Sequence, residues 1–139
     1  MNLDDNAQIK QLDSGNMLTH IDGLPEQLLA AWEHALGLRL PAYAGVSNIV
    51  ILGMGGSAIG GSLLRVLLAE ECTAPILSNR DYQLPAFVGP DTLVIASSYS
   101  GNTEETLAAL TVAQQRGAQI VSISRGGKIA ELTEEAGGL

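Results

Sequence analysis

The sequence predicts an α/β protein in which helices cover a parallel β-sheet. Short apolar runs, typical of buried strands, alternate along the chain with longer helical patterns. A glycine-rich turn at 53–61 follows the first strand-like run, and a serine-rich turn at 97–106 follows the third. Because a strand that returns to its sheet through a helix runs parallel to the strand before it, the alternation predicts parallel strands joined by right-handed crossovers.

The first half of the chain is predicted to hold two helices and two strands. Residues 24–36 form a helical pattern with Pro25 in the first turn and apolar side chains on one face. Residues 48–52 are expected to be a buried strand, residues 57–71 a helix, and residues 74–77 a second strand. We expect four apolar side chains of the 57–71 helix to point inward: Ile59, Leu63, Val66 and Leu67.

The second half continues the alternation. The expected elements are a loop at 82–91, a strand at 92–97, a helix at 103–116, a strand at 119–123 and a helix at 128–136. Gly117 is placed to end the 103–116 helix, and Gly126 and Gly127 form a turn. We expect residues 1–22 to be an N-terminal arm and residues 23–139 to be the domain. A fifth strand is expected in a longer parent protein, because each earlier crossover leads into a strand.

Composition and charge exclude several classes of protein. The 139 residues are 46% hydrophobic and carry a formal net charge of −8 at pH 7. Because nucleic acids and anionic membranes attract basic surfaces, neither is expected as a partner. Cys72 is the only cysteine, so no internal disulfide can form, and no apolar run is long enough to span a membrane. The N-terminus shows no signal-peptide pattern, which makes the cytoplasm the expected compartment.

The glycine-rich turn predicts a phosphate site. Glycine allows close approach of a ligand, and a helix N-terminus offers unpaired N–H groups and the positive end of the helix dipole. Gly61 stands where the G-x-x-x-x-G-K-S pattern needs lysine, which argues against a nucleoside triphosphatase. Gly53, Gly55 and Ala58 fit the weaker dinucleotide pattern, with Asp81 as a late acidic partner. The remaining alternative is a turn that serves only the packing of helix against strand.

The serine-rich turn supports the phosphate interpretation. Asn102 is predicted to cap the following helix, and Glu105 completes a capping-box pattern, which would leave the Thr103 hydroxyl free. Capping needs only one of the polar side chains, so the surplus favours an anion as ligand. The surplus hydroxyls belong to Ser98, Ser100 and Thr103. Neither turn contains Lys or Arg, so the two turns would bind an anion by local geometry.

At these residues the sequence resembles the sugar isomerase (SIS) family, and more narrowly the bifunctional phosphoglucose/phosphomannose isomerases of bacteria and archaea. The resemblance is carried by Gly-Met-Gly-Gly-Ser-Ala at 53–58 and by Ser-Tyr-Ser-Gly-Asn-Thr-Glu-Glu-Thr at 98–106. The stretches 13–17, 24–27 and 124–128 are also similar. The resemblance covers nearly the whole chain, but only the first of the two SIS domains of those enzymes.

The resemblance implies a flavodoxin-like three-layer α/β/α sandwich with strand order 2-1-3-4, in which the last strand would lie beyond this chain. It implies that Gly55, Gly56 and Ser57 line the sugar-phosphate site, and that Ser98, Ser100 and Thr103 hold the phosphate. The implied reaction interconverts glucose 6-phosphate, and mannose 6-phosphate, with fructose 6-phosphate through ring opening and a cis-enediol. No metal and no cofactor are expected.

The resemblance also implies that no catalytic residue lies in this chain. In the family, the glutamate base and the ring-opening histidine belong to the second SIS domain, the histidine comes from the partner of a homodimer, and an arginine that supports the intermediate follows just after residue 139. His20 and His34 are therefore interpreted as ordinary helix or arm residues, and Glu104 and Glu105 as acids that complement a helix dipole. The alternatives are a non-catalytic sugar-phosphate-sensing SIS domain, against which the acidic first 45 residues argue, and a dinucleotide-binding domain.

Overall fold

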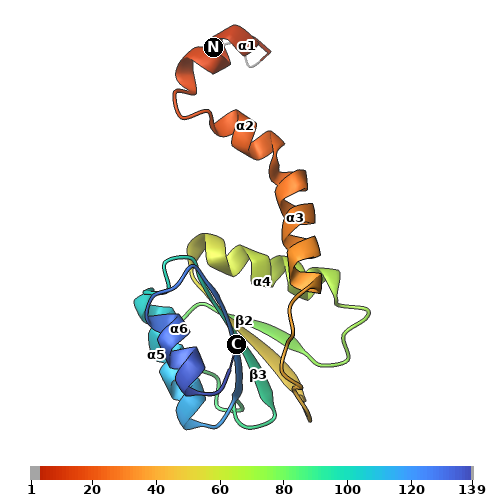
Figure 1. The fold of residues 1–139 in the computed structure, drawn as a ribbon, viewed down its shortest axis with the longest axis vertical. Coiled ribbons are helices and arrows are strands. Elements are labelled where there is room, and N and C mark those ends of the chain that lie inside the picture. Colours follow the sequence, from red (N-terminus) through yellow and green to blue (C-terminus); the bar gives the residue numbers. More distant parts are fainter. Residues whose placement is uncertain (1–3, 139) are drawn as a thin grey trace. The chain divides into compact units, whose positions relative to one another are not determined.

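The computed structural model describes residues 4–138 and divides into two compact units, Met1–Arg39 and Leu40–Leu139. The first unit contains the helices α1 (Asn6–Leu12), α2 (Met17–Asp22) and α3 (Leu24–Leu36), as Figure 1 shows. None of the residues in these three helices is buried. The predicted helix at 24–36 is confirmed, whereas the segment expected to be an arm contains two short helices; a domain boundary at residues 22 and 23 stays a prediction.

The second unit is an α/β sandwich around a four-stranded sheet (Figure 1). Its strands are β1 (Asn48–Leu52), β2 (Ile76–Asn79), β3 (Thr92–Ser98) and β4 (Gln119–Ser124). They lie in the order β2-β1-β3-β4 and every neighbouring pair is parallel, which confirms the predicted order. The chain leaves β1 in one direction through α4 (Gly55–Leu67), and continues from β3 in the other through α5 (Glu104–Gln115) and α6 (Lys128–Glu135). Helices therefore cover both faces of the sheet, and the winding reverses between β1 and β3.

The main core lies between the sheet and the helices α5 and α6. Burial along β3 alternates from residue to residue, because successive strand side chains point to opposite faces. Each fully buried Val or Leu contributes about 1.5–3 kcal/mol relative to an exposed one. The strand and helix residues of this core are Val50, Leu52, Val94, Ala96, Ala109, Leu110, Ala113, Ile120 and Ile129, with Leu84 and Val88 added by the 80–91 loop.

The inward direction predicted for four side chains of α4 is wrong. These side chains are 51–74% exposed, and we call them the α4 apolar stripe: Ile59, Leu63, Val66 and Leu67. The helix instead presents Ala58 and Gly61 to the sheet, and both are buried. A Cβ on Gly61 would lie 2.7 Å from Ile51 Cγ2, so the small residues let the helix approach the sheet closely. The larger apolar residues therefore lie on the opposite side of α4.

Two elements, β2 and α4, have bounds that differ from the prediction by two residues or more, whereas the bounds of the other predicted helices and strands differ by at most one residue. Strand β2 begins two residues later than expected, because its register is set by pairing with β1, in which Ile49 lies opposite Ile76. Helix α4 begins at Gly55 and ends at Leu67. The glycine-rich turn therefore forms the first turn of α4 itself. Among the residues that the structure describes, no helix is long and apolar enough to cross a membrane.

Candidate functional site

The glycine-rich turn and the serine-rich turn meet at the C-terminal edge of the sheet. Strands β1 and β3 are neighbours, with Leu52 opposite Ala96, so the residues after each strand emerge side by side. A Cβ on Gly53 would lie 3.1 Å from the Ser97 carbonyl oxygen, which shows how closely the two turns pack. Both turns lie at one edge, as predicted, where the winding of the chain reverses. Ligands of open α/β sheets bind at this position.

Helix α4 begins in the glycine-rich turn without a side-chain cap. Gly55, its first residue, has a φ of +51°, a left-handed conformation that favours glycine. Ala58 is the first residue of α4 whose backbone N–H donates a hydrogen bond, which it makes to the Met54 carbonyl at 3.4 Å. Within the described residues, the N–H groups of residues 55–57 have no acceptor. A Cβ on Gly55 or Gly56 would meet nothing within 4 Å, so the space in front of these donors is open.

Helix α5 also begins without a side-chain cap. Its N-cap residue is Thr103, whose side chain makes no capping hydrogen bond, so the predicted capping box of Asn102 and Glu105 is wrong. Leu107 is the first residue of α5 whose backbone N–H donates a hydrogen bond, which it makes to the Thr103 carbonyl at 2.9 Å. In the described part of the chain, the N–H groups of residues 104–106 lack acceptors. Two sets of unpaired N–H groups, each at the positive end of a helix dipole, thus lie at the same sheet edge.

The hydroxyls of the serine-rich turn are partly used by the turn itself. Ser98, which is 2% exposed, shares a hydrogen bond of 2.9 Å with the Thr103 hydroxyl and accepts one from the Gly101 N–H at 3.2 Å. The expectation of a free Thr103 hydroxyl is therefore wrong. Ser100 is exposed, and its hydroxyl accepts a hydrogen bond from the Asn102 N–H at 3.2 Å. A hydroxyl can donate one bond and accept two, so these groups keep capacity for a ligand.

A third loop, between β4 and α6, packs directly on the serine-rich turn. The Ile129 N–H donates to the Gly101 carbonyl at 3.0 Å, and the side chain of Asn102 accepts from the Lys128 N–H at 3.2 Å. Asn102 therefore caps α6 rather than α5. Gly101 has a φ of +69°, and a Cβ there would collide with the Gly126 carbonyl oxygen. The sequence pattern predicts only a turn at Gly126 and Gly127 and does not reveal this contact.

The cavity at this edge lies on the α4 side of the sheet. It has a volume of about 370 Å³ and is lined by Ser57, Ser97, Tyr99, Ile123, Ser124 and Arg125. Of the predicted site residues only Ser57 lines it. Ser98 alternates with Ser97 and Tyr99 and so points toward the opposite side of the sheet, where α5 begins. The structure thus places Ser98, Ser100 and Thr103 at the same edge but outside this cavity.

Glu104 and Glu105 are not among the residues that line this cavity. Desolvation raises the pKa of Tyr82, and the negative charges of Glu105 and Glu104 raise it further. His20 and His34 belong to α2 and α3 in the first unit. Among residues 4–138, no group of three or more His, Cys, Asp or Glu side chains could hold a metal ion.

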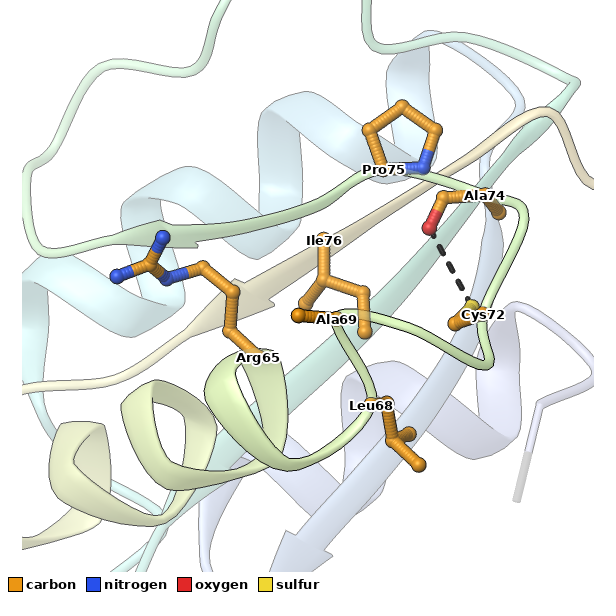
Figure 2. A pocket seen from close by; sticks show the side chains of 7 residues that line it. All are labelled: Arg65, Leu68, Ala69, Cys72, Ala74, Pro75 and Ile76. Atoms are coloured by element: carbon orange, nitrogen blue, oxygen red, sulfur yellow. Dashed lines mark hydrogen bonds between the residues drawn. The ribbon is translucent and has the colours of Figure 1, made fainter.

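Figure 2 shows a smaller pocket, of about 180 Å³, at the other end of α4. It lies between the C-terminal end of that helix and the start of β2, so it is at the edge of the sheet opposite to the two turns. The Cys72 thiol donates to the Ala74 carbonyl at 3.3 Å, and the Arg65 guanidinium points away from it (Figure 2). This pocket is therefore separate from the candidate site.

The SIS domain family matches residues 43–134, and the chain belongs to this family. It is similar to bifunctional phosphoglucose/phosphomannose isomerases. The one from Caldicellulosiruptor bescii is 49% identical over 122 residues, which are 87% of this chain and 36% of that protein. The one from Aquifex aeolicus is 42% identical over 107 residues, which are 76% of this chain and 32% of that protein.

A D-glucosamine-6-phosphate 4-epimerase from Sulfolobus acidocaldarius is 36% identical over 107 residues, 76% of this chain and 33% of that protein. The chain spans about a third of the length of these curated relatives. Among solved structures, the Escherichia coli tagatose-6-phosphate ketose/aldose isomerase has a TM-score of 0.55 at 23% identity, over 85% of this chain and 33% of that one, which supports the fold. The Vibrio vulnificus NanR protein complexed with ManNAc-6P has a TM-score of 0.54 at 25% identity, over 65% of this chain and 36% of that one.

Proposed function

We propose that this chain is the N-terminal, sugar-phosphate-binding SIS domain of an aldose–ketose isomerase of carbohydrate metabolism. The proposed reaction interconverts glucose 6-phosphate, and mannose 6-phosphate, with fructose 6-phosphate. The observation that carries the proposal is the pair of uncapped helix N-termini at one edge of the sheet. The similarity to bifunctional phosphoglucose/phosphomannose isomerases supports this choice of reaction.

The phosphate is proposed to bind between the two helix N-termini. Gly55, Gly56 and Ser57 would donate backbone N–H groups from the first turn of α4. The first turn of α5 would add its own N–H groups, together with hydroxyls from Ser98, Ser100 and Thr103. A hydrogen bond to a charged partner contributes about 1.5–3 kcal/mol, so a few such donors suffice for specific recognition of a phosphate.

The catalytic base is proposed to come from a second SIS domain. Conversion of aldose to ketose through a cis-enediol moves a proton from C2 to C1, at the end of the sugar opposite to the phosphate. A general base must lie within hydrogen-bond reach of the proton that it removes. Glu104 and Glu105 lie in the first turn of α5, next to the proposed phosphate position, and are too far from C2 in such a pose.

A second SIS domain and a second copy of the protein are the proposed partners of this chain. The α4 apolar stripe supports this, because exposed apolar surfaces of this kind mark contacts with other domains or subunits. The net charge of −8 supports the expectation that nucleic acid and anionic membranes are not partners. The cytoplasm stays the predicted compartment.

Calorimetric titration of the 139-residue chain with fructose 6-phosphate, glucose 6-phosphate and mannose 6-phosphate, next to a coupled assay of their interconversion, tests the proposal. We expect binding without turnover. Failure to bind any of the three sugar phosphates would contradict the proposed site. Turnover that disappears in Glu104→Gln or Glu105→Gln would instead contradict a base outside this chain.

A sugar-phosphate-sensing domain without catalysis is the second candidate. The likeness to the NanR protein favours it, because that protein has a similar fold and is complexed with the sugar phosphate ManNAc-6P. The two candidates share the ligand class and differ in turnover by the complete protein. A dinucleotide-binding domain is less well supported, since the Asp81 carboxylate accepts a hydrogen bond from the Gln83 N–H at 3.3 Å within its own loop. A melting-temperature increase with NAD but not with fructose 6-phosphate would favour it.

A further inference from the structure

We propose that Arg125 supplies the positive charge that binds the phosphate of the sugar phosphate, an inference that rests on the proposed function. The two turns assigned to the phosphate contain neither Lys nor Arg, so they offer only neutral donors. The structure brings Arg125 to the same edge from the third loop, between β4 and α6.

The position of Arg125 is set by the serine-rich turn. Its backbone N–H donates to the Tyr99 carbonyl at 3.2 Å, and its guanidinium Nη1 donates to the Tyr99 hydroxyl at 3.1 Å. Strands β3 and β4 are in register, with Ser98 opposite Ser124, so Tyr99 and Arg125 emerge next to each other on the α4 side of the sheet. These contacts tie the guanidinium to the loop that follows β3.

The guanidinium has unpaired donors, and Arg125 lines a cavity. Of the described residues that line the 370 Å³ cavity, only Arg125 is charged, and Ser57 of α4 is among the others. Within residues 4–138 Arg125 has no carboxylate partner, although the protein carries a net charge of −8. A guanidinium has five N–H donors, and the bond to Tyr99 uses one of them. The first turn of α4 reaches the same cavity through Ser57. An arginine in this position is suited to a phosphate, because a guanidinium can bind a phosphate through two parallel hydrogen bonds.

Under this assignment, neutral donors and a charged side chain have different roles in binding the phosphate. The backbone N–H groups in the first turn of α4, which reaches the same cavity through Ser57, recognise the shape of the phosphate. Arg125 makes binding depend on its charge, so a phosphorylated sugar is distinguished from the unphosphorylated one. Arg125 is therefore a specificity-determining residue for the proposed reaction rather than a catalytic one.

The test is calorimetric titration of the 139-residue chain with glucose 6-phosphate at two ionic strengths. We expect Arg125→Gln to raise Kd about tenfold or more and to reduce the salt dependence of binding. Arg125→Lys should keep the salt dependence and lose part of the affinity, because lysine keeps the charge but not the planar fork. Tyr99→Phe keeps the charge and removes one anchoring bond, so its Kd should rise by less than that of Arg125→Gln.

Arg116→Gln is the matched control, since it changes the net charge by the same amount. Arg116 lies at the C-terminal end of α5, where Nη1 donates to the Pro85 carbonyl at 2.7 Å, and its replacement should leave Kd unchanged. Wild-type affinity in Arg125→Gln overturns the inference and leaves the proposed function intact. Equal losses in Arg125→Gln and Arg116→Gln also overturn it, because they would reflect total charge alone. No binding by the wild-type chain overturns both the inference and the proposed function.

Discussion

Replacement of Gly56 by alanine separates the role of the glycine-rich turn in the fold from its role in binding. Gly56 is the second residue of α4, and a Cβ there would meet nothing within 4 Å. Its φ is outside the left-handed region, so alanine is not strained. Alanine in a helix is favoured over glycine by about 0.5–1 kcal/mol, and we expect the free energy of unfolding to rise by up to that amount. The added methyl group would occupy the open space beside the unpaired N–H groups, and we expect sugar-phosphate affinity to fall about tenfold, the equivalent of one lost charge-assisted bond.

Gly60→Ala is the matched control for this experiment. Gly60 lies one turn later in α4, is exposed, and also has nothing within 4 Å of its Cβ position. Both variants should gain similar stability in thermal or urea unfolding, and only Gly56→Ala should lose affinity for glucose 6-phosphate in calorimetry. If Gly56→Ala is more stable and binds as tightly as the wild type, the open space in front of α4 does not hold the ligand.

Three further predictions concern the turns and the first unit. Gly101→Ala should lower the free energy of unfolding by about 2–5 kcal/mol, of which about 1–2 kcal/mol comes from the positive φ and about 1–3 kcal/mol from the collision with the β4–α6 loop. A urea midpoint equal to that of the wild type would contradict this packing. Ser100→Ala should weaken sugar-phosphate binding about tenfold while unfolding changes by less than about 0.5 kcal/mol, and the reverse pattern would show a role in folding alone. Hydrogen bonds from the Leu18 and Met17 N–H groups hold the pKa of Asp13 below its ordinary value. The local stability of α2 should therefore be present at neutral pH and be lost as the pH falls below about 4. Amide exchange should show this loss in the wild type and not in Asp13→Asn.

The sheet could be predicted from the sequence because its signals are local. The run at 48–52 is a short β-branched segment bounded by turn residues, and the structure places β1 at those residues. The faces of α4 could not be predicted in the same way. Its sequence carries apolar residues on one face and small residues, Ala58 and Gly61, on another. Periodicity identifies an apolar face but does not reveal that the sheet contacts the face of small residues, since that depends on how closely the helix approaches.

The position of the candidate site in the fold could also be predicted, because its signals are local in the sequence. A strand followed by a glycine-rich or serine-rich turn and a helix places both turns at the C-terminal edge of a parallel sheet. The partner of Asn102 and the contribution of Arg125 were missed, because both depend on a loop that the pairing of β3 with β4 brings into contact. The signal that could have found Arg125 is its position directly after the fourth strand-like run, since every loop that follows a parallel strand opens at that same edge.

Titration of the ¹⁵N-labelled chain with glucose 6-phosphate, followed through its backbone amide resonances, tests the central claim most directly. We expect saturable shifts at Gly55, Gly56 and Ser57 and, at the same ligand concentration, at residues 104–106 in the first turn of α5, because these N–H groups are the proposed phosphate donors. Unphosphorylated glucose should leave the same amides unchanged. An unchanged spectrum, or shifts confined to the pocket of Figure 2 or to α1–α3, would contradict a sugar-phosphate site between the two helix N-termini.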